Sequence, residues 1–161
     1  SEELLKGREF EDYVLSLFNL QEDDELILQE WQGDKSYGKV KAENNRNPDF
    51  VFRHRQNEFA VECKWREKLS RDLSKDLFPI KRIENYKHFS EVRHMPVTII
   101  LGVGGEPCNP ELLYKIPLNE IAPIISGNQS IANYLHPVFS FDVSMFLRPE
   151  ENTKERAYTL S

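Results

Sequence analysis

The chain has 161 residues, 39% of them hydrophobic and 30% charged, with a formal net charge of -6 at pH 7. This size suits one globular domain, residues 1–161, that buries a core of its own. An apolar run of about 18 residues does not occur, and the N-terminus has no basic start before an apolar stretch, so we expect neither a membrane-spanning helix nor a secretory signal.

The first predicted element is an amphipathic helix over residues 2–20. Its apolar side chains recur at helical spacing and form one stripe, which comprises Leu4, Phe10, Val14, Leu17 and Phe18. Residues 25–31 predict a short strand that is rich in aliphatic side chains. The polar stretch over residues 32–47 carries Gly, Lys and Asn and predicts a mobile loop.

A β-hairpin is predicted next, because residues 49–55 and 58–66 are rich in Phe, Val and Trp and flank Gln56-Asn57. Residues 80–94 then predict a second helix, which Pro96 would end. Residues 97–103 are almost all apolar and β-branched, as expected for a central strand that is covered on both faces.

The order helix, strand, hairpin, helix, strand predicts an α/β fold. Its core would be αβββαβ over about residues 3–103, with a central mixed sheet flanked by helices. Residues 104–161 form a C-terminal extension without a recognisable motif, with a predicted strand at 112–116 and short helices near 118–125 and 130–135.

Strand alternation gives residues 58–66 two chemically different faces. One face carries Phe59, Val61, Cys63 and Trp65, and the other carries Ala60, Glu62, Lys64 and Arg66. A turn at Gln56-Asn57 would set Val51 opposite Glu62 and Asp49 opposite Lys64. Asp49 then shares a face with Glu62, about 7 to 8 Å away between backbones, so that both carboxylates could bind one ion.

Glu11 provides a third carboxylate. On a helical wheel it falls inside the apolar stripe, and Gly7, one turn earlier, would leave room beside it. Burial of a carboxylate without a partner costs several kcal/mol, so Glu11 should meet a cation, a donor or a metal. Three carboxylates beside Lys64 suit Mg²⁺ or Mn²⁺, because these ions prefer oxygen ligands and can activate a bound water.

The charge is unevenly distributed along the chain. Residues 35–88 hold 14 of the 21 Lys and Arg but only 8 of the 27 Asp and Glu, a net charge of +6, whereas the remainder carries -12. A basic middle is typical of nucleic-acid binding, although a charge run is more often an ordinary solvated face. Contacts with nucleic acid are expected from residues that follow the predicted site, with the basic ones binding phosphates; they are Arg66, Lys68, Lys81, Arg82 and Tyr86.

These motifs resemble the PD-(D/E)xK nuclease superfamily, which has the restriction-endonuclease-like fold. Pro48-Asp49 corresponds to PD, and Glu62-Cys63-Lys64 corresponds to ExK. The first helix, with Gly7 and Phe10-Glu11, is similar to that of Mrr-like and archaeal Holliday-junction-resolvase-type enzymes. Related enzymes often carry Gln and Tyr four residues apart on the second helix, and this chain has Arg82 and Tyr86 instead.

The resemblance implies a Mg²⁺- or Mn²⁺-dependent endonuclease that hydrolyses DNA phosphodiester bonds. Asp49, Glu62 and the main-chain carbonyl of Cys63 would hold the metal, and Glu11 would support it directly or through water. Lys64 would be the catalytic lysine, which orients the attacking water or counters charge on the phosphate. Two subunits could act together, because cutting both strands of a duplex requires two sites.

Other interpretations remain open. Asp49 could simply begin a strand, with Glu62 and Lys64 as a surface ion pair, although Glu11 would then be unexplained. A binding module for nucleic acid or protein that retains the fold, or an RNA-processing nuclease, would share these motifs. Cys63 and Cys108 match neither a disulfide framework nor a zinc site, which favours a reducing cytoplasm. The histidines show no metal-ligand spacing.

Overall fold

The computed structural model describes residues 1–32, 47–69, 79–122 and 131–149. A six-stranded sheet runs in the order β1-β2-β3-β4-β5-β6, with β3 and β4 parallel and every other neighbouring pair antiparallel. The elements are α1 (Glu2–Leu17), β1 (Leu26–Trp31), β2 (Phe50–His54), β3 (Asn57–Arg66), α3 (Ile80–Arg93), β4 (Val97–Val103), β5 (Leu112–Pro117), α4 (Leu118–Ile121), η3 (Ile131–Tyr134), β6 (His136–Pro137) and η4 (Val143–Phe146).

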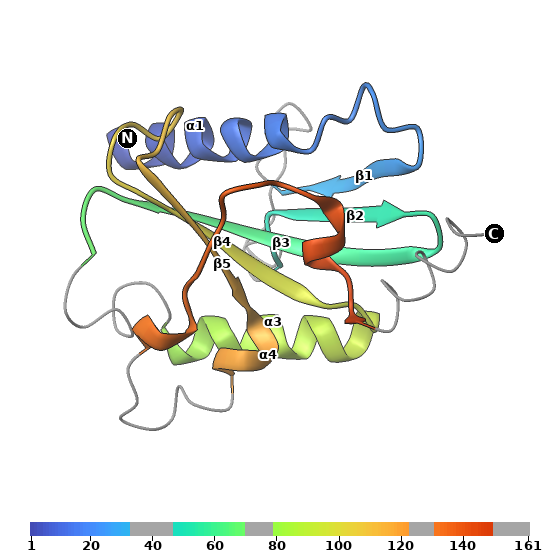
Figure 1. Cartoon of the computed structure of the whole chain (residues 1–161). Helices are drawn as coiled ribbons and strands as arrows, with labels where there is room; N and C mark the ends of the chain where they lie inside the picture. Colours follow the sequence, from blue (N-terminus) through green and yellow to red (C-terminus); the bar gives the residue numbers. More distant parts are fainter. Residues whose placement is uncertain (33–46, 70–78, 123–130, 150–161) are drawn as a thin grey trace.

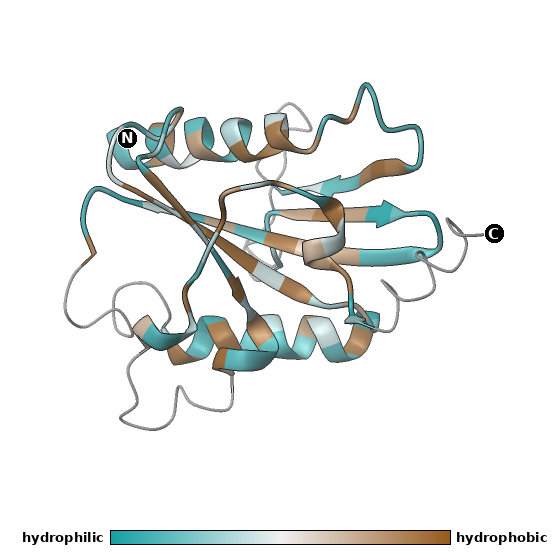
Figure 2. Ribbon diagram, viewed as in Figure 1, coloured by the Kyte–Doolittle hydropathy of each residue, from teal (hydrophilic) through white to brown (hydrophobic). Residues whose placement is uncertain are grey.

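The predicted α/β fold and the αβββαβ order are confirmed. Helix α1 covers one face of the sheet, and α3 and α4 cover the other (Figure 1). Figure 2 shows that the central strands are mostly hydrophobic, whereas the helices carry both hydrophobic and hydrophilic residues. Among the described helices, none is long and apolar enough to span a membrane.

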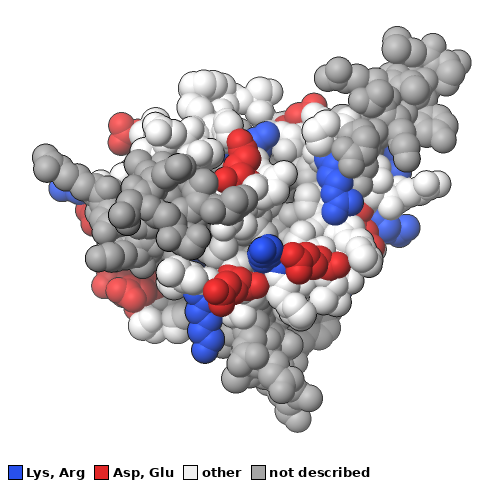
Figure 3. Space-filling view, turned by 90° about the horizontal axis from the view of Figure 1, so that it is seen from below, with Lys and Arg blue, Asp and Glu red and all other residues white. Residues whose placement is uncertain are grey.

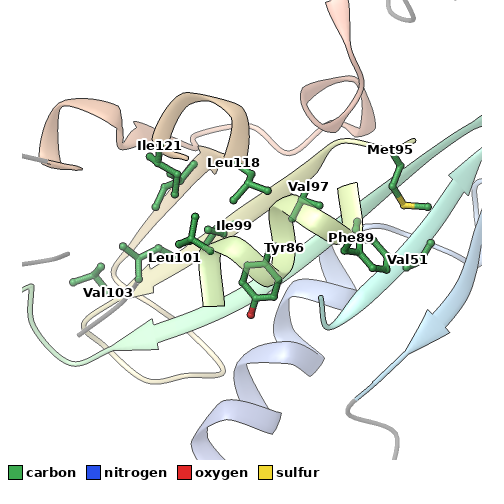
Figure 4. Packing of buried hydrophobic residues seen from close by; sticks show 13 residues of the cluster. Val51, Tyr86, Phe89, Met95, Val97, Ile99, Leu101, Val103, Leu118 and Ile121 are labelled. Carbon is green, nitrogen blue, oxygen red and sulfur yellow. The ribbon is translucent and has the colours of Figure 1, made fainter. Parts of the chain in front are cut away.

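Strand β4 is the centre of the sheet, as predicted. All seven of its residues are buried, between β3 on one side and β5 on the other. Its side chains divide between two apolar clusters: Ile99 and Leu101 point to the α3 side, and Ile100 points to the α1 side. Figure 4 shows the cluster on the α3 side. The strand therefore contributes side chains to the apolar packing on both faces of the sheet.

The C-terminal extension continues the sheet. The strand predicted at residues 112–116 is β5, and the predicted short helices are α4 and η3. The segment after β6 ends in η4, where Phe146 is 1% exposed and packs on the α1 side of the sheet. The mobile loop predicted over residues 32–47 lies almost wholly outside the described residues.

The predicted register of the hairpin is wrong by two residues. His54 pairs with Asn57, so the turn is formed by Arg55 and Gln56 rather than by Gln56 and Asn57. Arg55 adopts a left-handed φ of 57° and is held there by Glu25, which accepts both its main-chain N–H (3.2 Å) and its side-chain Nε (2.6 Å). A tertiary contact thus overrides the turn preference of Asn.

An even shift of register keeps every side chain on its predicted face. Val51 pairs with Ala60 and Phe50 with Val61, so Asp49, the residue before β2, falls level with Glu62. The predicted separation of β3 into an apolar face and a charged face therefore survives the correction, and the two carboxylates lie closer than expected.

Helix α1 is shorter than predicted and its apolar stripe is covered only in part. The helix ends at Leu17, with Phe18 as its C-cap, and its buried residues are Phe10 and Val14. Leu4 was expected in the buried stripe but is 63% exposed. The sheet therefore covers the helix from Phe10 onward and leaves its first turns open.

Close packing of α1 on β4 predicts a large effect of adding one methyl group at Gly102. A Cβ at Gly102 would lie 2.4 Å from the ring of Phe10, which is 1% exposed and has little room to move. We expect Gly102→Ala to lower the free energy of unfolding by about 1–3 kcal/mol, the usual cost of overpacking. Urea denaturation measures this change.

Gly7→Ala is the matched control. A Cβ there would meet nothing within 4 Å, and Gly7 lies inside a helix. Ala in place of Gly should therefore stabilise the protein by roughly 0.5–1 kcal/mol. Equal effects of the two substitutions would contradict the packing described for Gly102.

Candidate functional site

The site begins with two carboxylates, one from Glu62 on β3 and one from Asp49, the residue that precedes β2. The main-chain N–H of Asp49 donates to Oε1 of Glu62 (3.2 Å), and the main-chain N–H of Cys63 donates to Oδ2 of Asp49 (2.8 Å). Glu62 is 4% exposed, and Asp49 is half-buried. The hairpin therefore holds two acidic groups together where water can screen them only weakly.

The Asp49 carboxyl is harder to ionise in this position than in water. Burial raises the pKa of the Asp49 carboxyl well above its ordinary value, and the negative charge of Glu62 and a hydrogen bond with it raise this pKa further. Burial and the negative charges of Asp49, Glu11 and Glu62 likewise raise the pKa of the Cys63 thiol. Three acidic side chains therefore act electrostatically on Cys63, and a cation bound among them would lower the repulsion between them.

Glu11 reaches this cluster from α1. Its Oε1 is buried and has no hydrogen-bond partner among the described residues, and the same holds for Nε1 of Trp31 at the end of β1. Burial raises the pKa of Glu11 to about 7. The side-chain N–H of Trp31, which acts on this carboxyl without completing a hydrogen bond, opposes the rise in pKa, and the negative charge of Glu62 adds to it. A buried carboxylate oxygen without a partner is costly, so this position favours either a hydrogen bond from Trp31 after a small shift or a bound cation.

Three cationic or donor side chains converge on the other oxygen of Glu62, Oε2. Lys64 Nζ lies 4.0 Å away and Arg82 Nη1 lies 3.7 Å away, and the hydroxyl of Tyr86 donates a hydrogen bond. Burial lowers the pKa of Lys64, whereas the charge of Glu62 opposes this change. Glu62 is therefore the centre of the site, between Asp49 on one oxygen and these three groups on the other.

The position of Tyr86 differs from the prediction. The sequence suggested a contact with nucleic acid, but Tyr86 is 1% exposed and its ring packs in the core on the α3 side. Figure 4 shows its hydroxyl pointing out of the apolar cluster. Burial and the charge of Glu62 raise the pKa of this phenol, so it stays protonated and donates to Glu62.

Tyr86→Phe should therefore destabilise the protein without disturbing the core. The ring keeps its place while Glu62 loses a donor to a buried, charged oxygen, which costs about 1.5–3 kcal/mol. Tyr13→Phe, on the half-buried face of α1, is the control and should stay within about 0.5 kcal/mol of the parent. Urea denaturation measures the free energy of unfolding of both variants. A loss of less than about 0.5 kcal/mol for Tyr86→Phe would contradict the hydrogen bond from Tyr86 to Glu62.

The remaining predicted phosphate contacts are spread over the end of β3 and the start of α3. Lys68 and Lys81 are exposed, and Arg66 is half-buried and donates to the main-chain carbonyl of Trp65 (2.8 Å). The view from the side of α3 shows basic and acidic side chains mixed among the described residues rather than gathered by sign (Figure 3). Nucleic-acid binding on this face would depend on individual side chains.

The donor set fits a hard divalent cation. Each protein ligand offered by Asp49, Glu62 and Glu11 is a carboxylate oxygen, and one of these oxygens lacks a partner among the described residues. In that part of the chain, however, only Asp23, Glu25 and His54 bring three ligand atoms within 4.8 Å of one another. Oxygens bound directly to one Mg²⁺ at about 2.1 Å lie within about 4.2 Å of one another, so the three carboxylates as placed cannot all bind one ion directly, and at least one would contact it through water.

Sequence reasoning missed the group of Asp23, Glu25 and His54 at the far end of β2. His54 Nε2 lies 3.7 Å from Asp23 and 3.9 Å from Glu25, and Arg55 also binds Glu25. Arg55 Nε forms an ion pair with Glu25 at 2.6 Å, so one of the two carboxylates already has a cationic partner. No spacing pattern marks the group, because β2 and the turn before β1 meet only in the folded chain.

No family model matches the sequence, and no curated protein matches it. A similar solved structure is that of Hjc, a Holliday junction resolvase from the archaeal hyperthermophile Archaeoglobus fulgidus, with 15% identity and a TM-score of 0.45 over 92% of this chain and 98% of that chain. A likeness of this degree carries no argument about function, which depends on the side chains described above.

Proposed function

We propose that the chain is a divalent-metal-dependent nuclease that hydrolyses phosphodiester bonds in DNA. The observation that carries this proposal is the position of Glu62, whose carboxylate accepts the main-chain N–H of Asp49 at 3.2 Å on one oxygen and lies 4.0 Å from Lys64 Nζ on the other. Two carboxylates and a lysine in one half-buried place combine a cation site with a proton-transfer or charge-stabilising group.

Asp49 and Glu62 would hold Mg²⁺ or Mn²⁺, together with the main-chain carbonyl of Cys63, and Glu11 would support the ion through water. When bound, such an ion polarises a phosphoryl oxygen and lowers the pKa of a coordinated water. The hydrogen bonds from Asp49 to Glu62 and from Cys63 to Asp49 fix both carboxylates before any ion arrives. The pair is thus preorganised.

Lys64 would be the catalytic lysine. Its side chain is 10% exposed and its pKa is lowered by burial, so its proton is more readily given up than that of a surface lysine. Beside Glu62 it could orient the attacking water or counter the negative charge that develops on the phosphate. Arg66, Lys68, Lys81 and Arg82 would bind neighbouring phosphates.

The proposal is tested by incubating the purified chain with plasmid, linear duplex and branched DNA in Mg²⁺, Mn²⁺ or EDTA. We expect cleavage with either ion and none in EDTA. RNA of matching sequence is the second substrate, since cleavage of RNA alone would identify an RNA-processing nuclease. Binding of DNA without cleavage in any ion would instead identify a non-catalytic module that retains the fold.

A further inference from the structure

Arg82 and Lys64 contact the same carboxylate oxygen from different environments. Lys64 has a side chain that is 10% exposed, whereas that of Arg82 is 47% exposed although its Nη1 lies 3.7 Å from the buried Glu62. Tyr86, one turn further along α3, donates to the same oxygen. Arg82 therefore extends from the solvent side of the site to its centre, and half of its side chain remains free of packing.

Arg82 and a divalent cation would compete for the carboxylate of Glu62, because both are positively charged. Glu62, Asp49 and Glu11 bring three carboxylates together, and Lys64 and Arg82 supply two positive charges beside Glu62. A divalent cation on Glu62 would add two more positive charges within a few ångströms of both side chains, and like charges repel. Lys64 is enclosed by its surroundings, but Arg82 can swing into solvent.

The guanidinium of Arg82, once it leaves Glu62, can bind a phosphate group of the nucleic acid. Planar guanidinium groups bind phosphate through two parallel hydrogen bonds, and they do so more readily than ammonium groups. We propose that Arg82 is the internal counter-ion of Glu62 in the metal-free protein and passes to a phosphate of the nucleic acid when a divalent cation occupies the carboxylates. This inference rests on the proposed function and adds to it a coupling between metal binding and substrate binding.

The coupling predicts opposite effects of one substitution on two ligands. Removal of the guanidinium should strengthen metal binding, because the cation no longer displaces an ion pair from Glu62. It should weaken nucleic-acid binding only when metal is present, because without metal the guanidinium is engaged by Glu62. A plain surface phosphate contact would lower nucleic-acid affinity equally in both conditions.

The test measures Mn²⁺ affinity without nucleic acid, by electron paramagnetic resonance of the free ion. Arg82→Gln should bind Mn²⁺ roughly two- to fivefold more tightly than the parent, the range expected from loss of a half-exposed ion pair. Arg82→Lys keeps the charge and should stay close to the parent. Lys87→Gln removes a charge from an exposed position of the same helix and should leave Mn²⁺ affinity unchanged.

A second measurement follows the binding of a short DNA duplex with Ca²⁺ or with EDTA. Arg82→Gln should weaken binding by roughly fivefold in Ca²⁺ and by less than twofold in EDTA. Equal losses in both conditions, or unchanged or weaker Mn²⁺ binding by Arg82→Gln, would overturn the inference and leave the proposed function standing. Failure of the parent itself to bind Mn²⁺ would overturn the proposed function, and this inference with it.

Discussion

Asp49→Asn should abolish metal-dependent cleavage and at the same time make the metal-free protein more stable. The amide has nearly the shape of the carboxylate, so its oxygen can still accept the hydrogen bond from the main chain of Cys63. It carries no charge, however, and cannot serve as an anionic ligand beside Glu62. We expect cleavage to fall by at least about 10³-fold, as for loss of a group that holds the activating ion.

The gain in stability has a separate physical cause. Burial and Glu62 raise the pKa of Asp49, which means that its charged form is less favourable in the folded protein than in the unfolded chain. Asn removes that repulsion, and we expect a gain of about 1–2 kcal/mol at pH 7. A domain of this size then melts roughly 2–4 °C higher for each kcal/mol.

The gain should shrink as the pH is lowered. A carboxyl with a raised folded pKa costs stability above its ordinary pKa and costs none once it is protonated in both states. Calorimetry at neutral and acidic pH follows this change. Asp24→Asn, at an exposed turn position, is the control and should change neither cleavage nor melting temperature. A less stable Asp49→Asn protein would contradict the electrostatic description of the pair.

Lys64→Met should remove catalysis and leave metal binding intact. Met keeps most of the aliphatic length of the enclosed lysine side chain, so the packing beside β4 should persist. The ammonium group is lost, and with it the proton donor or counter-charge at the phosphate. We expect the rate of cleavage to fall by about 10²–10⁴-fold, the usual contribution of such a group.

Lys64→Met and Asp49→Asn should differ in their affinity for Mn²⁺. Mn²⁺ affinity should be unchanged or higher in Lys64→Met, because a positive charge 4.0 Å from Glu62 is gone. Calorimetric titration with Mn²⁺ measures it, and Lys87→Met on the exposed side of α3 controls for loss of a lysine charge. Cleavage by Lys64→Met at the rate of the parent would exclude Lys64 from the reaction.

The parts of the fold that follow from local chemistry were predictable from sequence. The run over residues 97–103 has no polar face, and it forms the buried centre of the sheet. Alternation along β3 separated Glu62 and Lys64 from the apolar side chains, and this separation depends only on the geometry of a strand. The inward position of Glu11 followed from the helical period in the same way.

Features that depend on contacts between distant segments were not predictable. The turn at Arg55 is fixed by Glu25, thirty residues earlier, and no local turn preference reveals that contact. The burial of Tyr86 depends on how α3 packs on the sheet, because its helical spacing is equally compatible with an exposed phenol. The same applies to Arg82, whose distance from Glu62 is set by that packing.

Diffraction from crystals soaked in Mn²⁺, recorded where manganese scatters anomalously, tests the central claim most directly. We predict an anomalous peak between the carboxylates of Asp49 and Glu62, with Glu11 linked to it through water. A peak at Asp23, Glu25 and His54 alone, or no peak beside Glu62 at an ion concentration that supports cleavage, would contradict the assignment of the site.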